Sequence, residues 1–280
     1  MRKSAITIAL FLAFLGPQLF GQDFTGLATY KTAMKMNIAM DSTEMSADQQ
    51  SLMQQRLMKA LQKEYELSFN AYESNWKEVG KLDKETASDG IQIVMVGAGG
   101  GEDGLLYKNT KEANFIETTD AFGKLFLVSG AMEKPEWKIT DESKQIGQYT
   151  CYKATSEREV TETRMTEMNG EKVETEEKRM QTTTVWYTPD IPVAHGPDTY
   201  WGLPGLILEA SNGNRVIICN KVVLNPKNKA VITIPSKGKK VTAEAYEEIM
   251  REQSQKMRKM YGGGKRKGQS GNSISISIDN

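Results

Sequence analysis

Few residue types in this chain could carry out covalent chemistry, and the only histidine is the first to consider. His195 stands in a loop rich in proline and glycine, with Asp190 and Asp198 near it in sequence. A Ser-His-Asp hydrolase also needs a serine nucleophile beside the histidine, but the chain has no Gly-x-Ser-x-Gly elbow to present one. An enzyme that uses His195 is therefore kept only as a remote alternative.

Two cysteines, Cys151 and Cys219, lie in strand-like segments on either side of that loop. A disulfide between them is chemically allowed if the protein is exported, because the space outside the cytoplasm is oxidising. The other interpretation is a pair of separate buried thiols, since free cysteine behaves as a small apolar residue. One histidine and two distant cysteines do not make a zinc ligand set.

Methionine is unusually frequent, with 15 residues including the first. Met34, Met36 and Met40 alternate with polar residues, as expected on one face of a half-buried strand. Thioethers are soft ligands that suit Cu(I), so these three residues, with His195, form the alternative metal site. Flexible methionines also line surfaces that adapt to apolar ligands, and we favour this interpretation, with no cofactor. The residues expected to contact such a ligand are Met34, Met36, Met40, Leu57 and Trp201.

A glycine run gives the one motif that could indicate a nucleotide. Gly99, Gly101 and Gly104 satisfy the spacing G-x-G-x-x-G after an apolar segment. That spacing needs a helix N-terminus behind it to hold a pyrophosphate, whereas the residues that follow are strand-like. We therefore interpret the run as a flexible hairpin loop.

The first 21 residues have the pattern of a signal peptide. Arg2 and Lys3 precede an apolar run over residues 5–15, and a Gly-Pro pair ends it. The run is too short to span a bilayer, so we expect cleavage, export to the periplasm or cell envelope, and no transmembrane segment afterwards. Removing Arg2 and Lys3 from the 36 Lys and Arg residues leaves 34 against 36 Asp and Glu, which argues against a nucleic-acid partner.

The remaining chain of 280 residues, 39% of them hydrophobic, suits one domain over residues 22–261. Two amphipathic helices are predicted. Ser46 and Gln49 form a capping box before a helix from about Ala47 to Lys63, and Thr242 caps a helix to about Tyr261. The predicted strands cover residues 25–40, 64–79, 105–107, 114–117, 124–129, 137–140, 148–154, 216–224 and 230–234.

Residues 157–187 form a second distinctive segment. Asn169-Gly170 is a strong signal for a two-residue hairpin turn, which pairs Met168 with Glu171. The flanks consist almost entirely of Thr, Glu, Arg and Lys, so both faces should meet water. We predict a projecting hairpin arm.

Proline and glycine punctuate the stretch 186–210, and Pro204-Gly205 predicts a tight turn. Leu206 and Leu208 should lie on one face of the strand that follows, and Ile207 on the other. The six residues Gly202, Leu203, Pro204, Gly205, Leu206 and Ile207 spell GLPGLI.

This segment is the name-giving signature of the GLPGLI family of bacterial envelope proteins. The upstream IPVAHGP and the segment 137–154 also resemble common segments of that family, so the resemblance covers roughly residues 137–224. It implies a location in the envelope and supplies no reaction, ligand or active site.

We therefore expect a mainly β protein with two helices (α+β) and a curved antiparallel sheet, similar in outline to lipoprotein-carrier folds. Residues 262–280 should be a flexible tail with a possible last strand at 273–278. The expected function is that of an exported, non-enzymatic binding or carrier module, whose partner is an apolar ligand or an envelope protein.

Overall fold

The computed structural model describes residues 24–34, 62–79, 104–168, 171–213, 215–228 and 231–262, and the single positions 46, 48, 51, 52 and 55. In these ranges twelve strands form one open sheet and one helix follows the last strand. Neighbouring strands are antiparallel except β12 and β6, which are parallel. The prediction of a mainly β, mostly antiparallel fold is therefore confirmed.

The elements follow one another as β1 (Gly26–Met34), β2 (Glu64–Phe69), β3 (Glu73–Glu78), β4 (Leu105–Asn109), β5 (Asn114–Ala121), β6 (Lys124–Ala131), β7 (Lys138–Ile146), β8 (Tyr149–Met168), β9 (Glu171–Thr188), β10 (Leu206–Ser211), β11 (Arg215–Leu224), β12 (Lys239–Thr242) and α2 (Ala243–Gly262). Across the sheet the order is β12-β6-β5-β4-β3-β2-β1-β11-β10-β9-β8-β7. Consecutive antiparallel strands are mostly neighbours, as short connections favour.

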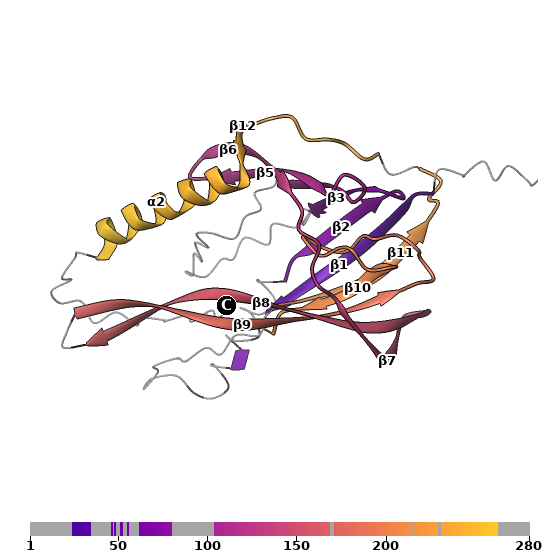
Figure 1. Cartoon of the computed structure of the whole chain (residues 1–280), viewed down its shortest axis with the longest axis horizontal. Helices are drawn as coiled ribbons and strands as arrows, with labels where there is room; N and C mark the ends of the chain where they lie inside the picture. The colour runs from indigo at the N-terminus through magenta and orange to yellow at the C-terminus, as the bar shows by residue number, and fades with distance from the viewer. Residues whose placement is uncertain are drawn as a thin grey trace, which may run out of the picture.

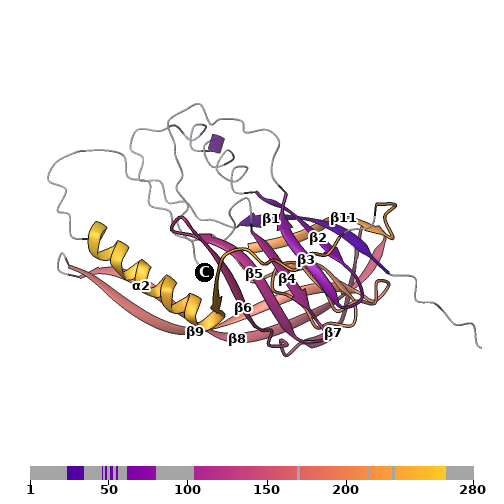
Figure 2. The same ribbon diagram turned by 90° about the horizontal axis from the view of Figure 1, so that it is seen from above.

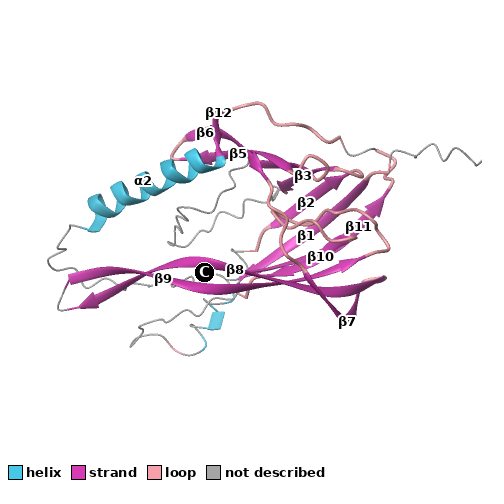
Figure 3. Cartoon of the chain, viewed as in Figure 1, coloured by secondary structure: helices cyan, strands magenta, loops and turns pink. Residues whose placement is uncertain are grey.

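The sheet bends strongly, so that β5 and β6 lie across from β8 and β9 with β1 and β2 between them (Figures 1 and 3). Contacts inside the bend require this shape. Lys108 of β4 bonds to the loop that follows β9, although five strands separate β4 from β9 in the sheet. We call the face that carries Tyr30, Leu67 and Trp76 the inner face.

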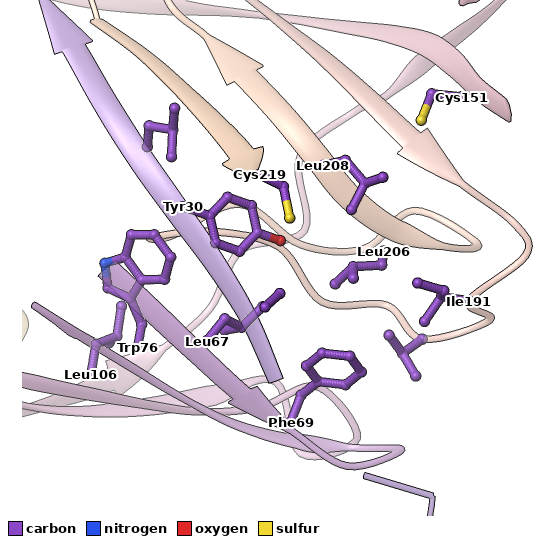
Figure 4. Close-up of a cluster of buried hydrophobic side chains, with 13 residues drawn as sticks. Tyr30, Leu67, Phe69, Trp76, Leu106, Cys151, Ile191, Leu206, Leu208 and Cys219 are labelled. Carbon is purple, nitrogen blue, oxygen red and sulfur yellow. The ribbon is translucent and has the colours of Figure 1, made fainter. Parts of the chain in front are cut away.

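The main core fills this inner face. Tyr30 and Trp76 meet edge to face with ring centroids 5.3 Å apart, and the Tyr30 hydroxyl donates to the Ile207 carbonyl at 2.8 Å. The buried members of this cluster, shown in Figure 4, are Ala28, Tyr30, Leu67, Phe69, Trp76, Leu106, Cys151, Ile191, Val193, Leu206, Leu208, Ile217 and Cys219. They come from strands on both sides of the bend, so this cluster fastens the two halves of the sheet together.

The predicted strand over residues 230–234 is wrong, because residues 231–237 are not in a strand. The Asn75 side chain takes the place of a neighbouring backbone: its Nδ2 donates to the Thr233 carbonyl at 2.9 Å, and its Oδ1 accepts from the Thr233 amide at 2.6 Å. The chain then enters β12, which sequence reasoning missed. β12 has only four residues and pairs with β6, more than 100 residues earlier.

Helix α2 begins as predicted, since the Thr242 hydroxyl accepts from the Ala245 amide at 3.2 Å. Tyr246, Ile249 and Met250 pack against β6, and the ring of Tyr246 meets Phe126 at a centroid distance of 5.4 Å. The rest of the helix extends beyond β5 and β6 (Figure 2). Among the residues described, no helix is both long and apolar enough to cross a membrane.

The first predicted helix lies almost wholly outside the described residues. Its described positions 48, 51, 52 and 55 are helical, and the Leu52 side chain is half exposed. The predicted signal peptide over residues 1–21 lies outside the described residues, as does the predicted tail over 262–280, except for Gly262 at the end of α2, and with it the possible strand 273–278.

The hairpin of β8 and β9 has the predicted register, with Met168 opposite Glu171. β7 pairs with β8 no further than Thr155, and β10 pairs with β9 only from Thr184 onward. The intervening part of the hairpin therefore projects from the body as a two-stranded arm (Figure 1). The predicted bounds of this arm, 157–187, are too wide, because residues 184–187 pair with β10 and both Val185 and Tyr187 are buried. We refer to residues 156–183 as the arm.

Candidate functional site

The loop 189–205, between β9 and β10, crosses the inner face and ends in the GLPGLI segment. Leu206 and Leu208 belong to the main core, whereas Ile207 packs in a second cluster with Leu203, as the sequence predicted. A Cβ on Gly205 would lie 2.2 Å from the Thr188 carbonyl oxygen. Only glycine fits there without moving backbone, so this part of the signature is explained by packing.

His195 is fully buried in this loop. Its Nε2 lies 3.1 Å from the Asn70 carbonyl oxygen, to which it donates, and its own carbonyl accepts from the Ile207 amide at 3.0 Å. Burial, and secondarily the charge of Lys108, lowers the pKa of His195 to about 3. The ring is therefore neutral near pH 7 and holds the loop against the turn between β2 and β3.

Lys108 holds the same loop from the other side, and sequence reasoning missed it. Its side chain is fully buried, and Nζ donates to the carbonyls of Gly196 at 2.8 Å, Tyr200 at 3.3 Å, and Asp198. Burial lowers the pKa of Lys108 to about 7, although the charge of Asp198 acts in the opposite direction. An ammonium has three donors, which match these three carbonyls.

Five half-buried side chains gather where the loop meets the open end of the inner face. Arg215 Nη1 and Asp198 Oδ2 form an ion pair at 2.7 Å, and Tyr65, Glu117 and Tyr200 each feel the charge of Asp198. We call these five residues the Asp198 cluster. They come from β2, β5, β11 and the loop, so only the bend of the sheet brings them together.

The electrostatics of this cluster favour protonated groups. Burial first, and the charge of Asp198 second, raises the pKa of Glu117 to about 7. Burial, and then the charge of Glu78, raises the pKa of Tyr65 to about 12. Burial also raises the pKa of Tyr200. Near neutral pH the cluster therefore offers hydroxyl groups and a carboxyl group that is substantially protonated.

The floor under the cluster is aromatic. Tyr65 stacks on Trp76 with centroids 4.7 Å apart and an interplanar angle of 5°, while Trp76 itself is buried. Asp198 adopts a left-handed backbone conformation, with φ of 52°. Such a conformation is uncommon for residues other than glycine and occurs often at binding sites.

The residues predicted to contact an apolar ligand are only partly described. Met34 is the last residue of β1 and pairs with Arg215, so its backbone lies beside the Asp198 cluster. Trp201 is engaged elsewhere: its indole N–H donates to the Glu133 carbonyl at 3.2 Å, and its own carbonyl accepts from Trp137 at 2.9 Å. Met36, Met40 and Leu57 lie outside the described residues.

Cys151 and Cys219 are both buried and free, so the suggested disulfide is not formed in this structure. They stand on β8 and β11, with β9 and β10 between them in the sheet. Three steps of about 4.8 Å make roughly 14 Å along the sheet, well beyond the roughly 7 Å that a disulfide tolerates between Cα atoms. Burial raises the pKa of Cys151 to about 11 and that of Cys219 to about 12.

The part of the chain that the structure describes contains no group of three or more His, Cys, Asp or Glu side chains placed to hold a metal ion. His195, part of the alternative copper site, has Nε2 bonded to the Asn70 carbonyl. It is also sealed from solvent. The methionines of that site lie outside the described residues, except for the backbone of Met34.

In comparisons with known proteins, a family model matches the loop 189–205 and the strands on either side of it. Residues 137–209 match a family described as a protein of unknown function (Porph_ging). Curated proteins gave no match. Solved structures of PNGF-II, in space groups C2 and P21, are similar at 16% and 17% identity with TM-scores of 0.46 and 0.45. The similarity covers 81% of this chain and 33% of the PNGF-II chain, so this chain spans about a third of that protein's length.

Proposed function

We propose that this protein is an exported binding module of the bacterial envelope, without catalytic activity, that holds an apolar ligand or an apolar segment of another protein. Membership of the GLPGLI family is part of this proposal. It is supported by the signature at residues 202–207 and by the family match over residues 137–209, which includes it. Export is supported by the leader-like pattern of residues 1–21.

The observation that carries the proposal is the arrangement at the open end of the inner face. The Asp198 cluster is half exposed, whereas the aromatic and aliphatic floor beneath it, formed by Tyr30, Trp76 and Leu106, is buried. Binding sites commonly combine an apolar floor with a few convergent polar groups. A bent sheet with a helix over one end of its inner face also supports the likeness in outline to lipoprotein carriers, although fold alone does not define function.

An enzyme is the weaker proposal, because the reactive side chains among the described residues are buried in the core or bonded to the backbone. His195, Lys108 and both cysteines are buried, and the first two bond to backbone carbonyls of the loop and its support. A general base has to reach its substrate within about 3 Å. The groups that remain accessible, in the Asp198 cluster, are better suited to orienting a bound molecule.

A fluorescent fatty-acid probe tests the proposal. Purified protein should bind the probe, and Tyr65→Ser should weaken binding at least tenfold because the stacked ring beside the floor is lost. Tyr72→Ser is the matched control, since Tyr72 lies 56% exposed in the turn after β2. Circular dichroism should show that both variants remain folded.

Two results would count against this function. Absence of probe binding by the unaltered protein would remove the carrier interpretation, and equal weakening by both substitutions would remove the proposed location. Dialysis after exposure to Cu(I) gives a further comparison. Retention of stoichiometric copper would favour the methionine-based alternative.

A further inference from the structure

The positive charge of this chain is distributed unevenly near its C-terminus. After Glu252 the next acidic residue is Asp279. Between these two the sequence contains six basic residues, Lys256, Arg258, Lys259, Lys265, Arg266 and Lys267. The whole chain has equal numbers of basic and acidic residues, so this segment concentrates positive charge that the rest of the molecule balances.

Helix α2 divides into two halves with different surroundings. Tyr246, Ile249 and Met250, in the first half, pack on β6. The same apolar stripe continues through Met257 and Met260 in the sequence, but this second half extends beyond β5 and β6, on which the first half packs (Figures 1 and 2). The acidic residues of the helix lie in the first half, the last of them being Glu252.

The second half combines an apolar stripe with flanking positive charge. Positions 256 and 258 lie about 100° on either side of Met257 around the helix axis, and both are basic. Lys256 is 62% exposed, and its contact with Glu252 is 3.9 Å long, which makes it a weak surface pair. Met257 is only partly buried.

We propose that the second half of α2, residues 253–262, docks on an anionic lipid surface. Basic amphipathic helices lie in membrane interfaces with the apolar face toward the acyl chains and the cations among the headgroups. Anionic lipids attract each nearby Lys or Arg. The chain would then be held on the membrane by its surface, without a span.

A second copy of the chain is a less suitable occupant. The arm of β8 and β9 projects to the same side as α2 (Figure 1) and carries many carboxylates, among them Glu157 and Glu159. Glu, Thr, Arg and Lys make up 19 of its 28 residues, however, and its valines and methionines, including the exposed Met180, are interspersed among them. The arm therefore offers no broad apolar surface for the methionine stripe. A bilayer supplies both the negative charge and the apolar layer that this half of the helix matches.

This inference does not depend on the ligand site proposed above, because α2 packs at β6, whereas the Asp198 cluster is built from the loop 189–205 and from β2, β5 and β11. A failure of one can therefore be distinguished from a failure of the other. The fatty-acid probe reports on the cluster in the absence of membranes, and vesicle binding reports on α2.

Co-sedimentation with vesicles tests the proposal, using protein purified after export so that any leader removed during export is absent. Vesicles of phosphatidylcholine alone are compared with vesicles that contain about one third phosphatidylglycerol. We expect binding to the anionic vesicles only, falling as salt is added. Each basic residue near the surface contributes roughly a fivefold gain, so K256Q/R258Q/K259Q should weaken binding at least tenfold.

The matched control is K77Q/K124Q/K221Q, which removes the same charge from exposed positions on the sheet. It should weaken binding less than threefold, and Met257→Ser should weaken it without changing its salt dependence. Equal binding to both kinds of vesicle, or equal loss in the two triple variants, would overturn the proposal. The proposal would also be overturned if the protein did not bind vesicles but formed dimers through α2. Sedimentation velocity would detect such dimers, and the K256Q/R258Q/K259Q variant would abolish them.

Discussion

Glu117 loses much of its contact with water on folding and also feels the charge of Asp198, so its ionisation is linked to stability. Its folded pKa of about 7 lies above the ordinary value of 4.5. Between these values the folded chain retains a proton that the unfolded chain has lost. The stabilising contribution is therefore fully present below about pH 4.5 and is lost as the pH rises through about 7.

Glu117→Gln should remove this dependence. The variant should exceed the unaltered protein in free energy of unfolding by roughly 1–3 kcal/mol at about pH 8, and the difference should shrink toward pH 4.5. Urea titrations at several pH values measure it. If the free energies of unfolding of the two proteins changed in parallel with pH, Glu117 would have to be solvated in the folded state.

Lys108→Met should be strongly destabilising although it keeps the volume and removes a buried charge. Three loop carbonyls would lose their donor, and a buried polar group without a partner costs about 1–3 kcal/mol. We expect a total loss of about 2–5 kcal/mol at about pH 6 in denaturant titration. Lys77→Met, at an exposed position of β3, should change stability by less than about 0.5 kcal/mol.

The structural roles of Lys108 and His195 could not be predicted from the sequence. The sequence gives Lys108 as one lysine after a short apolar run, whereas its three acceptors are 88 to 92 residues away. The residue type of His195 alone makes it a candidate for catalysis. Its structural role depends on the Asn70 carbonyl, 125 residues earlier, which no local pattern reveals.

At the scale of elements, β10, which begins within the GLPGLI segment, should be a main source of stability. Leu206 is fully buried in the main core, so Leu206→Ala should cost about 2–5 kcal/mol through lost contacts and the resulting cavity. Pro204→Ala is the control because Pro204 is exposed. A loss below about 1 kcal/mol for Leu206→Ala would contradict the assignment of this segment to the core.

The arm should contribute little to the stability of the body. Deleting residues 163–178 and closing β8 to β9 with a new two-residue turn should leave the melting temperature within about 2 °C, because the remaining pairs next to β7 and β10 are unchanged. Thermal unfolding followed by circular dichroism gives the answer. A large decrease would show that the arm packs on the body.

Elements defined by local signals could be predicted from the sequence, and those defined by distant partners could not. The sequence pair Asn169-Gly170 predicts the register of β8 and β9 that the structure shows, and Thr242 marks the start of α2. The segment 230–234 has an equally strand-like sequence, but the side chain of Asn75 occupies the backbone amide and carbonyl of Thr233. β12 has no strong signal of its own; it pairs with β6, beside the place where the first half of α2 packs.

At the scale of the whole molecule, the bend of the sheet creates the candidate site. Tyr30 and Lys108 each reach from the inner face to the loop or strand that follows β9. These contacts bring Tyr65, Glu117 and Arg215 together around Asp198, although they belong to separate strands. Mainly β composition was predictable, whereas the closeness of these residues follows from long-range contacts that composition does not encode.

Native mass spectrometry of the protein purified from the exported fraction tests the central claim, that this chain is a carrier of apolar ligands, most directly. We predict a species heavier than the polypeptide by the mass of one small molecule, lost on extraction with organic solvent and absent from a Tyr65→Ser sample prepared alongside. A mass equal to that of the bare chain in both samples would contradict the account, as would an added mass corresponding to copper.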